Sequence, residues 1–150
     1  MIIVACTDDP NLVEIAQKSS QKYPAVFGKY YKVFDTVIPQ IDRGEDLFVI
    51  AHGVYNGDEG RPVIGDRQRD FYLNAEDLYL NLKTHFPQGY KGNIFIDACE
   101  SADYNNTVSF IEILKTFIND GGLKSRVFGR EGCSSGLISL PTDRGWIEAR

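Results

Sequence analysis

The strongest structural signal in the sequence is the stretch Asn93-Ile94-Phe95-Ile96-Asp97-Ala98-Cys99-Glu100-Ser101. Its first half is mostly apolar, contains two β-branched isoleucines and follows a glycine. A short apolar run bounded by glycine and polar residues is typical of a strand that is buried on both faces of a sheet. Open α/β sheets bind ligands just beyond the carboxyl ends of their strands, and Cys99 follows the strand directly. The stretch therefore predicts an α/β fold with a cysteine at a strand tip.

A second stretch has the same form. Residues 46–51 (Asp-Leu-Phe-Val-Ile-Ala) are mostly apolar and lead straight into His52 and Gly53. We expect two buried strands that end in reactive side chains, one in His52 and the other in Cys99.

The composition sets the class of protein. A chain of 150 residues with 43% apolar and 25% charged residues is typical of one soluble globular domain, which we place at residues 1–150. The net charge of −5 argues against a nucleic-acid or anionic-membrane partner. No apolar run approaches the roughly 20 residues of a membrane span, and the apolar N-terminal run is too short for a signal peptide, so we expect a cytoplasmic protein. Three cysteines without a CxxC motif argue for reduced thiols and against disulfides or a metal site.

The periodicity along the chain predicts alternating strands and helices. Strands are expected at residues 2–6, 32–38, 46–51, 93–99, 125–129 and 136–140, and helices at 10–22, 107–119 and over about a dozen residues after Asn74. A turn-rich segment, 54–69, is expected to border a substrate cleft, with short hairpin strands at 63–64 and 71–73. This order predicts a mostly parallel sheet with helices on both faces.

Cysteine and histidine at neighbouring strand tips suit nucleophilic catalysis. A thiolate is a strong nucleophile but needs a base to form near neutral pH, and histidine can take that proton and later return it to a leaving amine. Gly53 allows its backbone amide to approach a substrate carbonyl closely, as an oxyanion-hole donor. A lone cysteine in a strand is more often a small buried apolar residue, and we interpret Cys6 and Cys133 in that simpler way. His85 is interpreted as a favourable charge near a helix C-terminus.

Val49-Ile50-Ala51-His52-Gly53 and Phe95-Ile96-Asp97-Ala98-Cys99-Glu100-Ser101 together resemble the two catalytic blocks of the caspase-like (clan CD) cysteine peptidases. The caspase signature has its histidine about 50 residues upstream of the cysteine, as here. The resemblance covers the chain in order through the fifth expected strand. It implies a caspase-like three-layer α-β-α sandwich, with Cys99 as the nucleophile, His52 as general base and acid, and Gly53 as an oxyanion donor. No metal or organic cofactor is implied.

The resemblance also suggests how substrate is selected. Asp97 falls where metacaspases and clostripain-like peptidases carry the aspartate of an Asp-x-Cys pattern, which helps to accept arginine or lysine before the cleaved bond. Asp8 or Asp9, after the first strand, is a candidate second wall of that pocket, and Ser101 is a further candidate for substrate binding. The simpler roles remain open: a hydrogen bond that holds the strand-end turn for Asp97, and helix capping for Asp8 or, more readily, Asp9.

Two departures from the family pattern leave alternatives open. Glu100-Ser101-Ala102 lacks the glycine that metacaspases carry after the cysteine, and is closer to the CHAT branch of the superfamily. The segment after residue 129 is short for a caspase-type substrate groove. The leading hypothesis is a cysteine endopeptidase acting on protein or peptide substrates. The main rival is a catalytically silent or latent caspase-like interaction module with a dimer or regulatory partner. A third alternative is a flavodoxin-like or hydrolase-like protein in which Cys99 only packs, although no glycine-rich phosphate loop follows the first strand.

Overall fold

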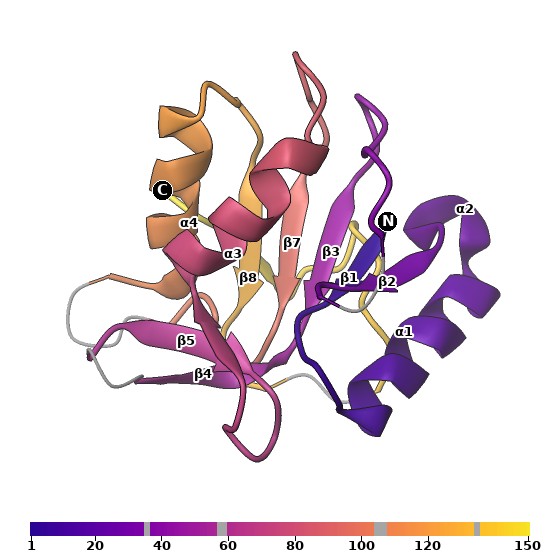
Figure 1. Cartoon of the computed structure of the whole chain (residues 1–150), viewed down its shortest axis with the longest axis vertical. Coiled ribbons are helices and arrows are strands. Elements are labelled where there is room, and N and C mark those ends of the chain that lie inside the picture. The colour runs from indigo at the N-terminus through magenta and orange to yellow at the C-terminus, as the bar shows by residue number, and fades with distance from the viewer. Residues whose placement is uncertain (35–36, 57–59, 104–107, 134–135) are drawn as a thin grey trace.

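The computed structural model describes residues 1–34, 37–56, 60–103, 108–133 and 136–150. Within these residues, a central sheet runs in the order β2-β1-β3-β7-β8-β9, and only its last pair, β8 and β9, is antiparallel. The strands are β1 (Ile2–Val4), β2 (Tyr30–Lys32), β3 (Leu47–Ile50), β7 (Ile94–Asp97), β8 (Val127–Arg130) and β9 (Trp146–Glu148). The predicted mixed α/β fold with a mostly parallel sheet is confirmed at this level (Figure 1).

The helices are α1 (Pro10–Lys22), the short α2 (Pro24–Phe27), α3 (Ala75–Leu82) and α4 (Phe110–Asp120), and a 3₁₀ turn, η1 (Lys83–His85), extends α3. The three longer helices start at a residue whose side chain accepts a hydrogen bond from a backbone N–H of the first turn, namely Asp9, Asn74 and Ser109. Proline at the first position of α1 leaves no orphaned N–H there. The expected bounds of α1 are therefore met, and α4 begins at Phe110 because its cap is Ser109.

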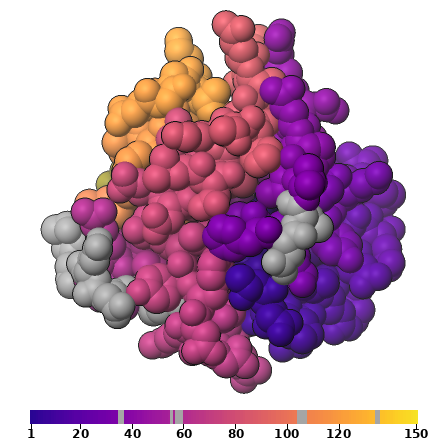
Figure 2. All heavy atoms as spheres, in the orientation of Figure 1, coloured from indigo at the N-terminus to yellow at the C-terminus, as the bar shows by residue number. Residues whose placement is uncertain are grey.

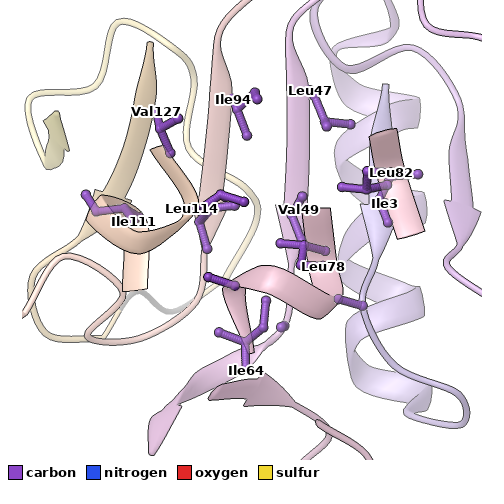
Figure 3. Close-up of a cluster of buried hydrophobic side chains, with 14 of the residues drawn as sticks. Ile3, Leu47, Val49, Ile64, Leu78, Leu82, Ile94, Ile111, Leu114 and Val127 are labelled. Atoms are coloured by element: carbon purple, nitrogen blue, oxygen red, sulfur yellow. The ribbon is translucent and has the colours of Figure 1, made fainter. Parts of the chain in front are cut away.

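Helices cover both faces of the sheet. Alternate residues of the strands, such as Ile3, Val49 and Ile96, pack against α3 and α4 on one face, and Figure 3 shows Leu78 and Leu114 reaching into this layer. The other face packs against α1 and α2, where the ring of Phe48 stacks on Phe95 with centroids 4.9 Å apart. Burial on both faces explains why these strands read as continuous apolar runs.

A second, smaller sheet begins at His52. It is antiparallel in the order β4-β5-β6, with β4 (His52–Asn56), β5 (Pro62–Gly65) and β6 (Tyr72–Asn74). The expected hairpin strands are present as β5 and β6. Residues 54–56, expected in the turn-rich segment, instead belong to β4, because the chain leaves the central sheet at Ala51 and continues extended to pair with β5.

Two expected strands were placed wrongly. The second strand lies at Tyr30–Lys32 instead of 32–38, part of which (35–36) falls outside the described residues. Residues 136–140 form no strand: the side chain of Ile138 is buried, and its amide donates to Oγ of Ser19 instead of joining a ladder. The strand that follows β8 is β9, which returns antiparallel beside it.

The two ends of the sheet differ in character. At the amino ends of β3 and β7, the loops around Arg43 and Lys91 project side by side, joined by a 2.7 Å hydrogen bond from Lys91 N–H to the Arg43 carbonyl (Figure 1, Figure 2). The carboxyl ends, beside the small sheet, carry His52 and Cys99. This is the end at which open α/β sheets bind ligands.

Candidate active site

His52 and Cys99 are brought together because β3 and β7 are neighbouring parallel strands in register. Ile50 pairs with Asp97, so the residues that follow each strand emerge side by side. The backbone N–H of Val54 donates to the carbonyl of Cys99 at 2.7 Å. A methyl group on Gly53 would lie only 2.3 Å from Cβ of Cys99, so glycine is required for this close approach. The structure thus places the two strand tips next to each other.

A cavity of about 80 Å³ opens at this junction. Its lining includes both candidate catalytic residues and Asp97, and the remaining walls come from α1, the end of β3 and Gly136, which follows β8. The lining residues are Leu12, Ile15, Ile50, Ala51, His52, Asp97, Cys99 and Gly136. Cys99 is half-buried and is one of the residues that line this cavity.

Cys99 sits in a tight turn. The N–H of Ser101 donates to the carbonyl of Ala98 at 3.2 Å, and Glu100, the third residue of this turn, has φ of +61°. This is the arrangement of a type II turn, whose third position favours glycine. A left-handed glutamate costs about 1 kcal/mol, and such strain clusters at functional sites. The N–H of Glu100 donates to the carbonyl of Gly132 at 2.8 Å, which fixes the turn that presents Cys99.

His52 is in contact with a buried carboxylate. Nε2 of His52 lies 3.0 Å from Oδ2 of Asp9, whose side chain is 5% exposed. The angle of approach falls outside hydrogen-bond geometry, so the contact is electrostatic and strengthens when the imidazole is protonated. Asp9 also caps α1 through Leu12 N–H (3.3 Å) and accepts a hydrogen bond from Arg67 N–H (3.3 Å).

The sequence predicted two roles for Asp9, a helix cap and a wall of the substrate pocket. The cap is present in the structure. The contact with His52 was not predicted. The available signal was topological. Asp9 follows β1, and β1 is the other parallel neighbour of β3, so the residues after all three strand tips converge.

Asp97 lines the cavity and also faces a buried arginine that sequence reasoning did not place in the site. Nε of Arg130 lies 3.8 Å from Oδ1 of Asp97, and both side chains are at least nine-tenths buried. The Arg130 guanidinium stacks 4.3 Å above the Trp146 ring and lies 3.4 Å from the carboxylate of Asp143. It also contacts Oγ of Ser139. The negative charge of Asp97 thus already has a buried cationic neighbour, the guanidinium of Arg130.

The other two predicted substrate contacts lie elsewhere. Asp8 is exposed and is not among the described residues that line the cavity. Ser101 is fully buried: its hydroxyl donates to the Ile96 carbonyl (3.1 Å) and accepts from Arg130 N–H (2.9 Å). One bond reaches β7 and the other reaches β8, so the Ser101 hydroxyl links the two strands.

The remaining cysteines differ from Cys99 in their surroundings. Cys6 is fully buried, and burial raises the pKa of its thiol to about 11, which disfavours the reactive thiolate. Cys133 is exposed, in a loop. Cys99, by contrast, lines a cavity together with His52.

Comparison of the chain with models of protein families, with curated proteins and with solved structures finds no match. In the part of the chain that the structure describes, no helix is long and apolar enough to cross a bilayer. The same residues hold no cluster of three or more His, Cys, Asp or Glu side chains placed to bind a metal ion. Any functional conclusion therefore depends on the geometry of the site.

Proposed function

We propose that the protein is a caspase-like cysteine endopeptidase in which Cys99 is the nucleophile and His52 the general base and acid. The observation that carries the proposal is the shared cavity: His52 and Cys99 follow adjacent parallel strands and line the same opening, with Gly53 packed directly against Cys99. A nucleophile and a base at one accessible site are the minimum that covalent acyl transfer requires.

The reaction would proceed in two halves. His52 takes the proton of the Cys99 thiol, and the sulfur attacks the peptide carbonyl to give a tetrahedral oxyanion beside the Gly53 amide. The carbon–nitrogen bond then breaks as His52 gives its proton to the leaving amine, which leaves an acyl-enzyme. Water, losing a proton to His52, attacks this thioester; the released sulfur regains the proton and the carboxylic acid product departs. Asp9 would stabilise the imidazolium that forms in each half.

The architecture supports the finer fold assignment included in the proposal. A mostly parallel sheet with helices on both faces is what the caspase-like resemblance implied, and the sheet here has that form. The three-layer caspase-like sandwich is our assignment from this agreement and from the positions of His52 and Cys99 at the strand tips.

The cavity lined by His52, Asp97 and Cys99 would accept a basic side chain on the amino side of the cleaved bond. Asp97 supplies a carboxylate to its lining, and arginine or lysine is the natural partner of a carboxylate. A substrate guanidinium would share Asp97 with Arg130, which approaches at 3.8 Å. This sharing should make the preference for a basic residue moderate.

The test combines turnover with labelling. The purified protein would be offered fluorogenic peptides ending in arginine, lysine or aspartate, and then an arginyl chloromethylketone, with the labelled cysteine mapped by mass spectrometry. Cleavage after arginine or lysine with the label on Cys99 is the expected result. Cleavage only after aspartate would retain the mechanism and refute the basic pocket. Absence of turnover with Cys99 unmodified in the folded protein would favour the non-catalytic interaction module.

A further inference from the structure

We propose that a second pocket beside His52 binds an acidic residue on the carboxyl side of the cleaved bond. This inference rests on the proposed function and names the substrate class more fully: a basic residue before the bond and aspartate or glutamate after it. The second pocket has a volume of about 190 Å³ and is lined by His52, Gly53, Val54, Asp66, Arg67 and Arg69. Of these residues, His52 alone is shared with the Cys99 cavity.

The arginines come from a loop with a fixed conformation. In the connection from β5 to β6, Asp66 N–H donates to the Phe71 carbonyl (3.1 Å), and Arg69 N–H donates to the Asp66 carbonyl (3.3 Å). Oδ1 of Asp66 accepts the N–H of Asp70 at 3.0 Å. Arg69 itself has φ of +64°, an uncommon conformation for a residue with a side chain. The loop is therefore closed by its own hydrogen bonds, and both arginines are presented from a defined backbone.

This loop is tied directly to the candidate catalytic histidine. Oδ2 of Asp9, the atom 3.0 Å from Nε2 of His52, also accepts the backbone N–H of Arg67 at 3.3 Å. One buried carboxylate oxygen thus fixes the imidazole and the start of the arginine loop relative to each other. A ligand held by Arg67 would be positioned beside His52 without any further ordering of the loop.

The charge of the second pocket contrasts with that of the chain. The chain carries a net charge of −5, yet the lining of this pocket contains two arginines and one aspartate. Asp66 is buried, and one of its carboxylate oxygens accepts a backbone N–H, whereas Arg67 is exposed. A guanidinium binds a carboxylate through paired hydrogen bonds, so the exposed part of the pocket suits aspartate or glutamate.

The chemistry of the reaction decides on which side of the bond this residue lies. The general acid must stand next to the nitrogen of the departing amine. The residues that follow the cleaved bond therefore leave past His52, and the pocket that extends from His52 away from the Cys99 cavity receives them. An acidic residue there would also attract the imidazolium that forms before the amine is released.

The test measures peptide binding separately from turnover. Cys99→Ala protein would be titrated with fluorescent peptides that have arginine before the bond, randomised residues further toward the amino end, and either Asp-Glu or Lys-Lys after the bond. We expect at least a tenfold lower Kd for the acidic peptides in low salt, and a smaller difference in high salt. In the double variant Arg67→Glu/Arg69→Glu the preference should reverse. Arg43→Glu, a matched control at the opposite end of the sheet, should leave it unchanged.

The outcomes separate the two proposals. Equal Kd values for acidic and basic peptides, or equal kcat/KM in wild-type protein, would overturn the second pocket while leaving the peptidase intact. An acidic preference in binding with no turnover by wild-type protein would retain the second pocket and refute the peptidase. If the double glutamate variant fails to fold, Arg67→Gln/Arg69→Gln replaces it, and a preference that survives both glutamines would overturn the inference.

Discussion

Oδ2 of Asp9 lies 3.0 Å from Nε2 of His52, and this contact joins the start of α1 to the end of β3. The carboxylate is almost completely buried and is further held by backbone N–H groups of Leu12 and Arg67. A carboxylate fixed in this way can orient the imidazole. Asp9 is thus a positioning residue for His52.

Asp9→Asn should lower kcat strongly while the protein stays folded. Asparagine is an equally good helix cap, so α1 keeps its start, but the neutral amide no longer stabilises imidazolium. We expect a loss of about 10- to 1,000-fold in kcat with a smaller change in KM, because the lost charge acts on the imidazolium of the proposed reaction and not on substrate binding. A loss of helix stability with an unchanged kcat would contradict the positioning role.

Cys99→Ala should abolish peptide hydrolysis, because no other group at the site supplies a nucleophile in the proposed reaction. Its fold should be intact, since a half-buried thiol at a turn contributes little packing. Cys133→Ala is the matched control: it removes an exposed thiol and should leave turnover unchanged. Inactivation by Cys133→Ala with retained activity in Cys99→Ala would refute the assigned nucleophile.

Gly53→Ala should impair the site through a steric clash. The new methyl would lie 2.3 Å from Cβ and 2.9 Å from the carbonyl oxygen of Cys99, so the Cys99 backbone would have to move. We expect a loss of about 1–3 kcal/mol in the free energy of unfolding and a marked loss of kcat. Gly44→Ala is the control, since no atom lies within 4 Å of its added methyl, and it should change stability by less than about 0.5 kcal/mol. Similar behaviour of the two variants would contradict the close packing of Gly53 on Cys99.

Asp97→Asn should reduce any preference for arginine or lysine before the cleaved bond by about tenfold or more, because the pocket loses its carboxylate. It should also destabilise the protein by about 1–3 kcal/mol, since the buried Arg130 loses a charged neighbour. Profiling kcat/KM over peptides that differ in this one residue measures the first effect, and urea unfolding the second. Asp8→Asn, at an exposed carboxylate, is the control for both. Retained basic preference in Asp97→Asn would refute the predicted pocket.

The sequence predicted the elements that depend on local patterns. The apolar runs of β3 and β7, the Asp9-Pro10 start of α1 and the Asn74 cap of α3 all follow from nearby residues, and the structure has each of them. The extended path of β4 escaped prediction because its partner β5 lies across a turn-rich segment. β9 was not predicted because it has only three residues, too few to show the periodicity of a strand. It is defined by its pairing with β8.

The candidate site was only partly predictable for a related reason. His52 and Cys99 follow apolar strands and Asp97 ends one, so all three are recognisable from the chain alone. The Asp9–His52 and Asp97–Arg130 contacts depend on which strands are neighbours, and the order β1-β3-β7-β8 is a tertiary property. The hydrogen bonds of Ser101 were not predictable from its closeness to Cys99 in sequence, because they depend on the turn that directs its hydroxyl into the β7–β8 junction.

Burial of Cys6 predicts a specific dependence of stability on alkaline pH. The pKa of this thiol is raised by burial from 9.0 to about 11 in the folded protein. Below pH 9 both folded and unfolded states hold the proton, and the stability of the buried neutral thiol is fully present. As the pH rises from about 9 to 11, the unfolded chain loses a proton that the folded protein keeps, so the free energy of unfolding falls, by about 2 kcal/mol in all.

Urea unfolding at a series of pH values between 8 and 11 would measure this slope in wild-type protein and in Cys6→Ala. The variant should show a shallower decline over the same range, because its alanine has no proton to lose. Tyr90, whose pKa burial also raises, contributes a decline of the same sign in both proteins, so the difference between the two curves isolates the thiol. Curves that run parallel throughout would show that the Cys6 thiol titrates alike in the folded and unfolded chains.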